Sequence, residues 1–363
     1  MALWEWLTTR IDQESERHIY LRVDPLHVDL YHDGAQAPLA AQAGEHYFRL
    51  RLAQMSLQKD RTWGKSWYPA VHSLVRLSFG GKTQEIPNVA DAGRAGLKAE
   101  REGTFVGGNF PLTTTLPFND GVIELEAGLY AMEGENYLNT VIGVLSSFSS
   151  LLAVPQVSSA LALAQPLASG IQNLFGGQDG HVHLSLHDSF GAGQLTAGYM
   201  VAINATEGEL RNVRDQLWVI DNQLRIGTGL ASGAHRAFDA YDYMLFWIEV
   251  FDRREDWRDF TSINEPFGRA LNDLKTDNLP SARIHRNESM INASQAPDLT
   301  IADRRRVPDQ ILAEYEAMKT KLGSGLTDTQ SPDLQTAMDR SSMSATAALL
   351  LGPRSPQEID GLP

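Results

Sequence analysis

The stretch YDYMLFWIEVF, residues 241–251, decides the fold class. Side chains alternate between the two faces of a β-strand. Both sets of alternating positions are apolar here, namely Tyr243, Leu245 and Trp247 on one face and Met244, Phe246 and Ile248 on the other. A strand that is apolar on both faces is covered above and below. The stretch therefore predicts a central strand in a layered β-fold.

Other segments are predicted to be strands, and several of them have the alternation typical of a strand with one wet face. They are HIYLRVD (18–24), YFRLRL (47–52), HVHLSLHD (181–188) and GYMVAINA (198–205). In YFRLRL, for example, Arg49 and Arg51 alternate with apolar residues. These strands fall into two groups along the chain, one before and one after residues 136–178.

Three segments have the pattern of β-hairpins, in which two alternating runs flank residues that tolerate positive φ angles. They are residues 74–86 around Gly80-Gly81, residues 116–133 around Asn119-Asp120-Gly121, and residues 217–226 around Asp221-Asn222. In the second hairpin, Ile123, Leu125, Ala127 and Leu129 are expected to point inward, and Glu124 and Glu126 outward.

The fold class that follows is mainly β with an α insertion: antiparallel, β-sandwich-like sheets with a helical hairpin between two strand groups. Two small β-rich domains joined by helices are the alternative. The predicted segments are 1–135 (first strand group), 136–178 (helical insertion), 179–280 (second strand group and helix), 281–322 (polar connection and helix) and 323–363 (disordered tail). Residues 1–280 are expected to form one composite domain.

The helical insertion is a run of 43 residues, Asn136–Gln178, without Asp, Glu, Lys, Arg or His, in a chain that is 21% charged. Apolar residues recur at helical spacing in it, and Pro155 and Pro166 interrupt the pattern. Two interpretations remain open: helices buried in the protein, or a segment that enters a membrane. Residues 137–154 are near the lower length limit for a membrane span.

The organisation of this run resembles the hydrophobic hairpin of pore-forming toxins, which is kept inside a soluble fold until it is released. The resemblance implies that the apolar stripe contacts a membrane or a partner. The residues expected to do so are Val141, Val144, Phe148, Leu152, Leu161 and Ile171.

Helices are also expected at residues 2–16, in EPFGRALNDL from Pro266, and in DQILAEYEAMKTKL (309–322). Residues 276–306 have the composition of a polar connection. After Gly323 the chain is rich in Ser, Thr, Pro and Asp, which is typical of a disordered segment.

The composition excludes several classes of function. The chain has 363 residues and a net charge of −14, which argues against a nucleic-acid partner because phosphate contacts need clustered Lys and Arg. It has no cysteine, so disulfides, thiol nucleophiles and Cys-type zinc sites are excluded. The first residues lack the pattern of a signal peptide, and a cytoplasmic location is expected, with membrane association after a trigger.

The segment HVHLSLHD is the strongest candidate for a metal site. His181, His183 and His187 fall on one side of the predicted strand. Two imidazoles at i and i+2 can share a divalent metal, whereas His187 is about 13 Å from His183 along a strand and a further ligand is needed from elsewhere. The alternative is that these histidines form the wet face of a half-buried strand.

The histidine spacing resembles the cupin pattern, in which an H-x-H pair on a β-barrel is followed several residues later by an acid. His187 lies near the position of that acid, and Asp188 follows it. The resemblance implies a metal-dependent enzyme. A second cupin motif is missing, because PFGRALND (266–273) lacks the histidine.

The segment FDRREDWRDF (251–260) is a cluster of mixed charge. It is expected to form a solvated loop, or a patch that binds a partner through Trp257 and its arginines. Nucleotide-binding, hydrolase and zinc-protease signatures are absent from the sequence. The sequence therefore favours a non-enzymatic binding or effector protein with a protein partner and no cofactor. The alternatives are a metal-dependent enzyme that uses His181 and His183, and a purely structural protein.

Overall fold

The computed structural model describes residues 18–31, 38–58, 61–62, 65–91, 104–133, 156, 180–191, 193–229 and 234–323. Apart from residue 156, these residues form two compact units. The β-rich unit ends at Arg253 and the helical unit begins at Arg254. Each unit is described by itself.

The largest sheet of the β-rich unit has six strands in the order β1-β10-β14-β2-β6, with β7 also paired to β2. All of its pairings are antiparallel. Its strands are β1 (Ile19–Arg22), β2 (Tyr47–Leu57), β6 (Thr104–Pro111), β7 (Leu116–Pro117), β10 (Gly198–Ile203) and β14 (Tyr243–Phe251). The apolar stretch 241–251 thus supplies β14, which has two strands on one side and at least two on the other, and its predicted central place is confirmed.

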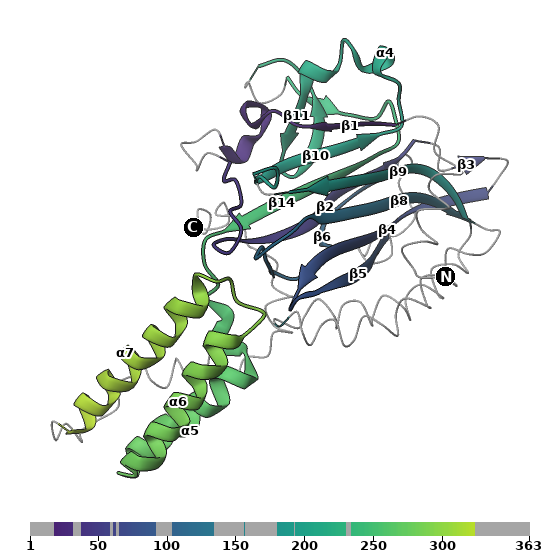
Figure 1. The fold of residues 1–363 in the computed structure, drawn as a ribbon. Coiled ribbons are helices and arrows are strands. Elements are labelled where there is room, and N and C mark those ends of the chain that lie inside the picture. The colour runs from purple at the N-terminus through teal and green to yellow at the C-terminus, as the bar shows by residue number, and fades with distance from the viewer. Residues whose placement is uncertain are drawn as a thin grey trace, which may run out of the picture. The chain divides into compact units, whose positions relative to one another are not determined.

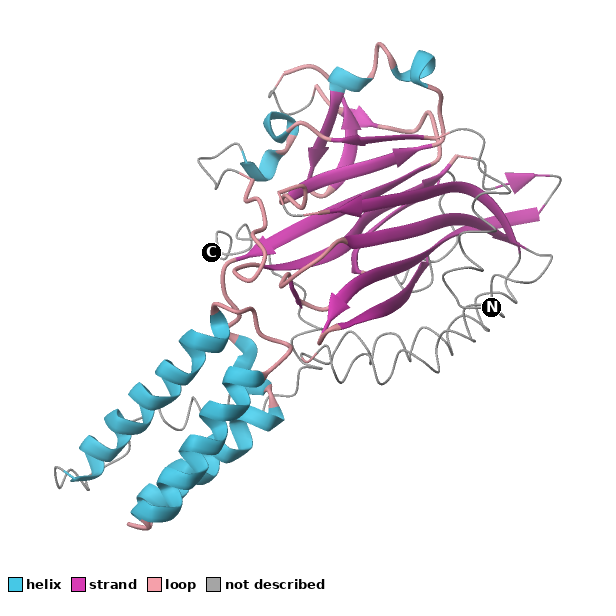
Figure 2. Ribbon diagram, viewed as in Figure 1, coloured by secondary structure: helices cyan, strands magenta, loops and turns pink. Residues whose placement is uncertain are grey.

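A second sheet has the order β3-β4-β8-β9, with β5 paired to β4. Its strands are β3 (Arg61–Thr62), β4 (Lys65–Phe79), β5 (Lys82–Asp91), β8 (Ile123–Glu133) and β9 (Gly180–Phe190). β4 contacts β2 and β6 of the first sheet, and β9 contacts β10. Figures 1 and 2 show the two sheets layered in this way. The predicted class, antiparallel and sandwich-like β-structure, is confirmed.

A third, small sheet has the order β11-β12-β13. Its strands are β11 (Leu217–Ile220), β12 (Gln223–Ile226) and β13 (Arg236–Ala237). The short helical elements of the β-rich unit are η1 (Pro25–His27), η2 (Asp29–Tyr31), α4 (Glu207–Leu210) and η3 (Arg214–Gln216). Side chains of β11 and β12 share one apolar core with those of β1, β10 and β14. The small sheet therefore covers part of the largest sheet.

Two of the three predicted hairpins are confirmed. β4 and β5 meet at Gly80 and Gly81, whose φ angles are 59° and 75°. β11 and β12 meet at Asp221 and Asn222, with φ angles of 52° and 61°. Positive φ at both central positions matches the right-handed twist of the paired strands.

The third predicted hairpin, at residues 116–133, is wrong. β7 pairs with β2 in one sheet, whereas β8 pairs with β4 and β9 in the other. Alternation identified β8 as a strand, but it cannot tell which strand is the partner. The four residues expected to point inward are buried, but Glu126, expected to point outward, is only 1% exposed. At Glu126, therefore, β8 is buried on both faces.

The helical unit contains η4 (Asp256–Asp259), α5 (Thr261–Lys275), α6 (Leu279–Gln295) and α7 (Asp303–Gly323) (Figure 1). The helix predicted at 309–322 is confirmed as part of α7, with Ile311 and Tyr315 buried. α5 begins five residues before Pro266, not at it. The three helices share one apolar core, to which η4 contributes Trp257.

The polar connection expected at residues 276–306 is wrong, because most of it is α6. The buried residues of α6 are small, namely Ala282, Ser289 and Ala293. The Ser289 hydroxyl donates to the Ile263 carbonyl at 2.7 Å. Small residues allow close packing of helices but leave little apolar periodicity in the sequence, which explains the error.

Several predictions fall on residues outside those that the structure describes. They concern the helix at 2–16, the uncharged run 136–178 with its six proposed contact residues, and the tail after Gly323. Within the described part of the chain, no helix has both the length and the apolar character needed to cross a membrane. The predicted boundaries of the five segments stay predictions.

Candidate functional site

A cavity of about 930 Å³ lies along β1 in the β-rich unit. We call it the β1 groove. Residues 20–25 form one wall, and the end of β9, residues 193–194 and residues 196–199 form others. Tyr31 and Arg214 also line the cavity. Its size is within the usual range for a ligand site, about 300–1,000 Å³.

β1 is at the edge of its sheet, as ordered among the described strands, and it pairs only with β10. The register places Leu21 opposite Val201, and the Val23 amide donates to the Tyr199 carbonyl at 3.0 Å. In an antiparallel pair, hydrogen-bonded and non-hydrogen-bonded positions alternate. Ile19, Leu21 and Val23 therefore direct their backbone groups toward β10. The backbone groups of Tyr20 and Arg22 point the other way.

The Tyr20 side chain is fixed in the groove wall. Its hydroxyl donates to the Asp188 carboxylate of β9, and the hydroxyl oxygen lies 2.8 Å from the Met200 sulfur. Burial raises the pKa of Tyr20 above its ordinary value, and the neighbouring Asp188 carboxylate raises it further. Tyr20 is therefore a neutral donor at any pH near neutrality, and it holds Asp188 against β1.

Arg22 connects β1 to another wall of the groove. Its guanidinium donates to the carbonyl of Gln194 at 2.8 Å and to that of Thr196 at 3.2 Å. Both acceptors belong to the segment that leads into β10. These two hydrogen bonds order the segment. The guanidinium group of Arg22 also contributes a positive charge to the groove.

The third wall follows β1 in the sequence. The Asp24 side chain accepts from the Leu26 amide at 2.9 Å and caps η1. The His27 ring stacks on Trp218 with a centroid distance of 4.3 Å, and its Nδ1 lies 3.1 Å from the Leu217 carbonyl oxygen. These contacts tie the wall to the small sheet.

The groove carries charges of both signs. Asp24, Asp188 and Asp215 contribute three carboxylates, and Arg22 and Arg214 contribute two guanidinium groups. Burial raises the pKa of Tyr31, so this tyrosine also stays neutral. A lining of tyrosines, carboxylates and guanidinium groups can bind a polar ligand through hydrogen bonds and charge.

The structure places two of the three candidate metal ligands. His183 lies at a β-bulge of β9, with its Nδ1 3.2 Å from Asp242 Oδ2. The His187 Nδ1 lies 3.1 Å from Glu126 Oε1. The side chain of His181 is outside the described part of the structure. The two described histidines thus pair with separate carboxylates.

Among the side chains that the structure describes, no group of three or more His, Asp or Glu residues is placed to hold a metal ion. The carboxylate beside each Nδ1 favours the tautomer with its proton on that nitrogen, which leaves Nε2 as the nitrogen available for a metal. The site predicted at His181, His183 and His187 stays a prediction.

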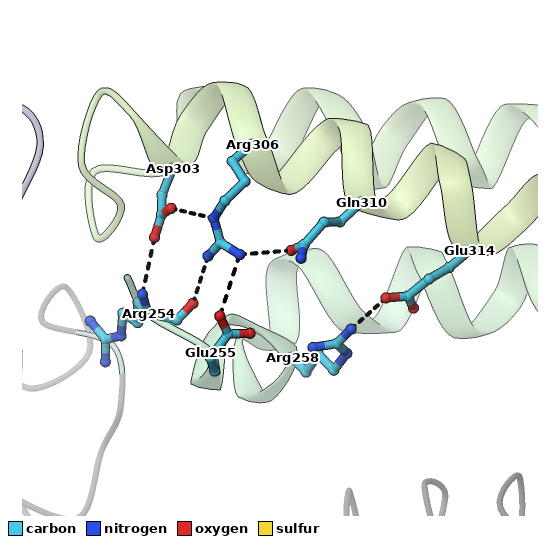
Figure 3. Close-up of polar contacts among 7 residues, drawn as sticks. All are labelled: Arg254, Glu255, Arg258, Asp303, Arg306, Gln310 and Glu314. Atoms are coloured by element: carbon cyan, nitrogen blue, oxygen red, sulfur yellow. Dashed lines mark hydrogen bonds and ion pairs between the residues drawn. The ribbon is translucent and has the colours of Figure 1, made fainter. Parts of the chain in front are cut away.

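In the charge cluster 251–260 most charged side chains are exposed, and Arg254 pairs with Asp256 of the same segment at 2.6 Å. Trp257 is fully buried and Arg254 is only 3% exposed, so neither side chain is available as the predicted surface patch. Arg306 of α7 connects this segment to the bundle, since it donates to the Arg254 carbonyl and to Asp303 (Figure 3). The cluster therefore stabilises the helical unit.

The sequence identified the strand that forms the groove but not the groove itself. HIYLRVD was recognised as a strand from Ile19, Leu21 and Val23, and Tyr20 and Arg22 appeared only as its polar face. Their role depends on which strand lies at the sheet edge and on the approach of β9, more than 150 residues later. The sequence feature that could have indicated a ligand site here is the mixture of Tyr, Arg, Asp and His between residues 18 and 27.

Comparison with known proteins adds no further constraint. No protein family model, no curated protein and no solved structure matches this chain.

Proposed function

We propose that this protein is a binding protein and that the β1 groove holds its ligand. The observation that carries the proposal is a cavity of about 930 Å³ whose walls are fixed by Tyr20, Arg22 and His27. The proposal fits the binding role expected from the sequence. We also propose that the protein is cytoplasmic, that its partner is a protein and that it does not bind nucleic acid.

The rigidity of the walls supports binding. Each of these side chains is held by another element: Tyr20 by β9, Arg22 by the segment before β10, and His27 by β11. Side chains that are ordered before the ligand arrives lose less conformational entropy on binding. A preformed polar groove is therefore suited to a specific ligand.

The effector role proposed for the uncharged run depends on residues outside those described and stays a prediction. The same is true of the metal-dependent enzyme. Neither role is needed for binding in the groove.

Filling the groove is expected to abolish binding. Ser189 is exposed and lines the groove at the end of β9. Ser189→Trp places a bulky ring there, whereas Ser294→Trp changes an exposed serine of α6 in the helical unit. A library of small amines, carboxylic acids and dipeptides is screened by thermal shift against the wild type and both variants.

Compounds that bind the groove raise the melting temperature of the wild type and of Ser294→Trp by several degrees. They are expected to leave Ser189→Trp unchanged. The proposal is wrong if every stabilising compound acts equally on all three proteins, or if neither this library nor a selection of peptides yields a ligand.

A further inference from the structure

We propose that the ligand of the β1 groove is an extended segment of a partner protein that carries a Lys or Arg side chain and pairs with β1 as an added strand. This inference rests on the proposed function, because it specifies the ligand of the same groove. It names the backbone of β1 as the main recognition element.

The direction of the backbone groups is the first argument. Tyr20 and Arg22 occupy non-hydrogen-bonded positions opposite Ala202 and Met200. Their N–H and C=O groups point away from β10, and within the described structure neither pairs with another strand. Two donors and two acceptors at the edge of a sheet form a template for another strand.

The position of the cavity is the second argument. The groove is lined by the continuous stretch from Tyr20 to Pro25, and other lining residues approach it from β9 and from η3. The cavity therefore adjoins β1 and is bounded by side chains of several other elements. Strand addition combines backbone hydrogen bonds, which give affinity, with side-chain contacts, which give specificity.

The charge of the lining selects the partner. Three carboxylates line the groove against two guanidinium groups. Asp188 and Asp24 already accept hydrogen bonds, and Arg22 already donates to two carbonyls. The net charge of the lining is −1 when His27 is neutral, and the whole chain carries −14. Complementary charge favours a basic segment and accelerates its association.

Peptides provide the test. Random linear peptides displayed on phage are selected on the full-length wild type, and a selected peptide is synthesised. Its backbone amides are then methylated one at a time. Strand addition predicts a period of two, because only alternate amides of an added strand face β1. Methylation of these amides is expected to lower the affinity about tenfold or more, with little effect between them.

A matched pair of variants tests the β1 side. Arg22→Pro removes the outward N–H, and proline is tolerated at an edge strand whose N–H faces away from the sheet. Arg22→Ala removes the guanidinium but keeps that N–H. Arg22→Pro is expected to bind the peptide about tenfold more weakly than Arg22→Ala does. Thermal unfolding confirms that both variants are folded.

The outcomes separate the two proposals. Peptides without a basic residue, methylation effects without a period of two, or equal binding by both Arg22 variants would overturn strand addition. If Ser189→Trp still abolishes binding in that case, the groove remains the ligand site. Failure to select any peptide overturns strand addition, and failure of the small-molecule screen as well overturns both.

A second copy of the chain is the competing occupant. If β1 of one molecule pairs with β1 of another, the wild type is a dimer and Arg22→Pro is a monomer. Light scattering with size-exclusion chromatography measures this directly. A dimer of that kind would contradict a partner peptide, whereas a monomeric wild type agrees with it.

Discussion

Replacing Asp303 with alanine is expected to lower the free energy of unfolding of the helical unit by about 3 kcal/mol. Asp303 is buried and accepts from the Arg254 amide at 3.2 Å and from Arg306 Nε at 2.6 Å (Figure 3). The substitution removes the acceptor of the buried Arg254 amide, and it removes a charged acceptor from Arg306, whose side chain is 22% exposed. The loss of a buried acceptor costs more than the loss of an exposed contact.

Hydrogen exchange measured by mass spectrometry on peptides from α5, α6 and α7 reports this loss. Glu314→Gln is the matched control, because Glu314 pairs with Arg258 where both side chains are more than 40% exposed. The control is expected to cost less than about 1 kcal/mol. Equal effects of the two substitutions would show that the buried network does not hold the unit together.

Acid is expected to destabilise the β-rich unit through His72. This side chain is fully buried in β4, and burial lowers the pKa of His72 from 6.5 to about 3. Between these two pH values the unfolded chain binds a proton that the folded protein excludes, so stability falls as the pH falls. The contribution amounts to about 2.5 kcal/mol between pH 6 and pH 4.

His72→Gln removes this titration while keeping a neutral polar side chain. Denaturant unfolding of the wild type and of the variant is compared at several pH values, so that the carboxylates common to both cancel. The wild type is expected to lose about 2.5 kcal/mol more than the variant between pH 6 and pH 4. Parallel pH profiles would mean that His72 takes up its proton in the folded state.

Local patterns in the sequence predicted much of the β-structure. Stretch 241–251 indicated a central strand because both of its faces are apolar, and β14 has that place. The turns at Gly80-Gly81 and Asp221-Asn222 were predictable because few residues adopt positive φ without strain. Such features depend only on neighbours in the sequence.

Features that depend on distant contacts were not predictable. β8 pairs with β9, which lies about sixty residues later in the sequence. The local pattern of residues 116–133 carries no information about this partner, and it predicted a hairpin instead. α6 was missed because its seam consists of small residues and a serine, which have no apolar period. The β1 groove likewise arises only when β9 brings Asp188 to Tyr20.

Amide hydrogen exchange of β1, measured by NMR with and without the selected peptide, tests strand addition at the β1 groove most directly. In the free protein, the Leu21 and Val23 amides face β10 and are expected to exchange slowly, whereas Tyr20 and Arg22 exchange fast. On peptide binding, exchange at Tyr20 and Arg22 is expected to slow about tenfold or more. Unchanged exchange at both amides, with the peptide bound, would contradict binding at this edge.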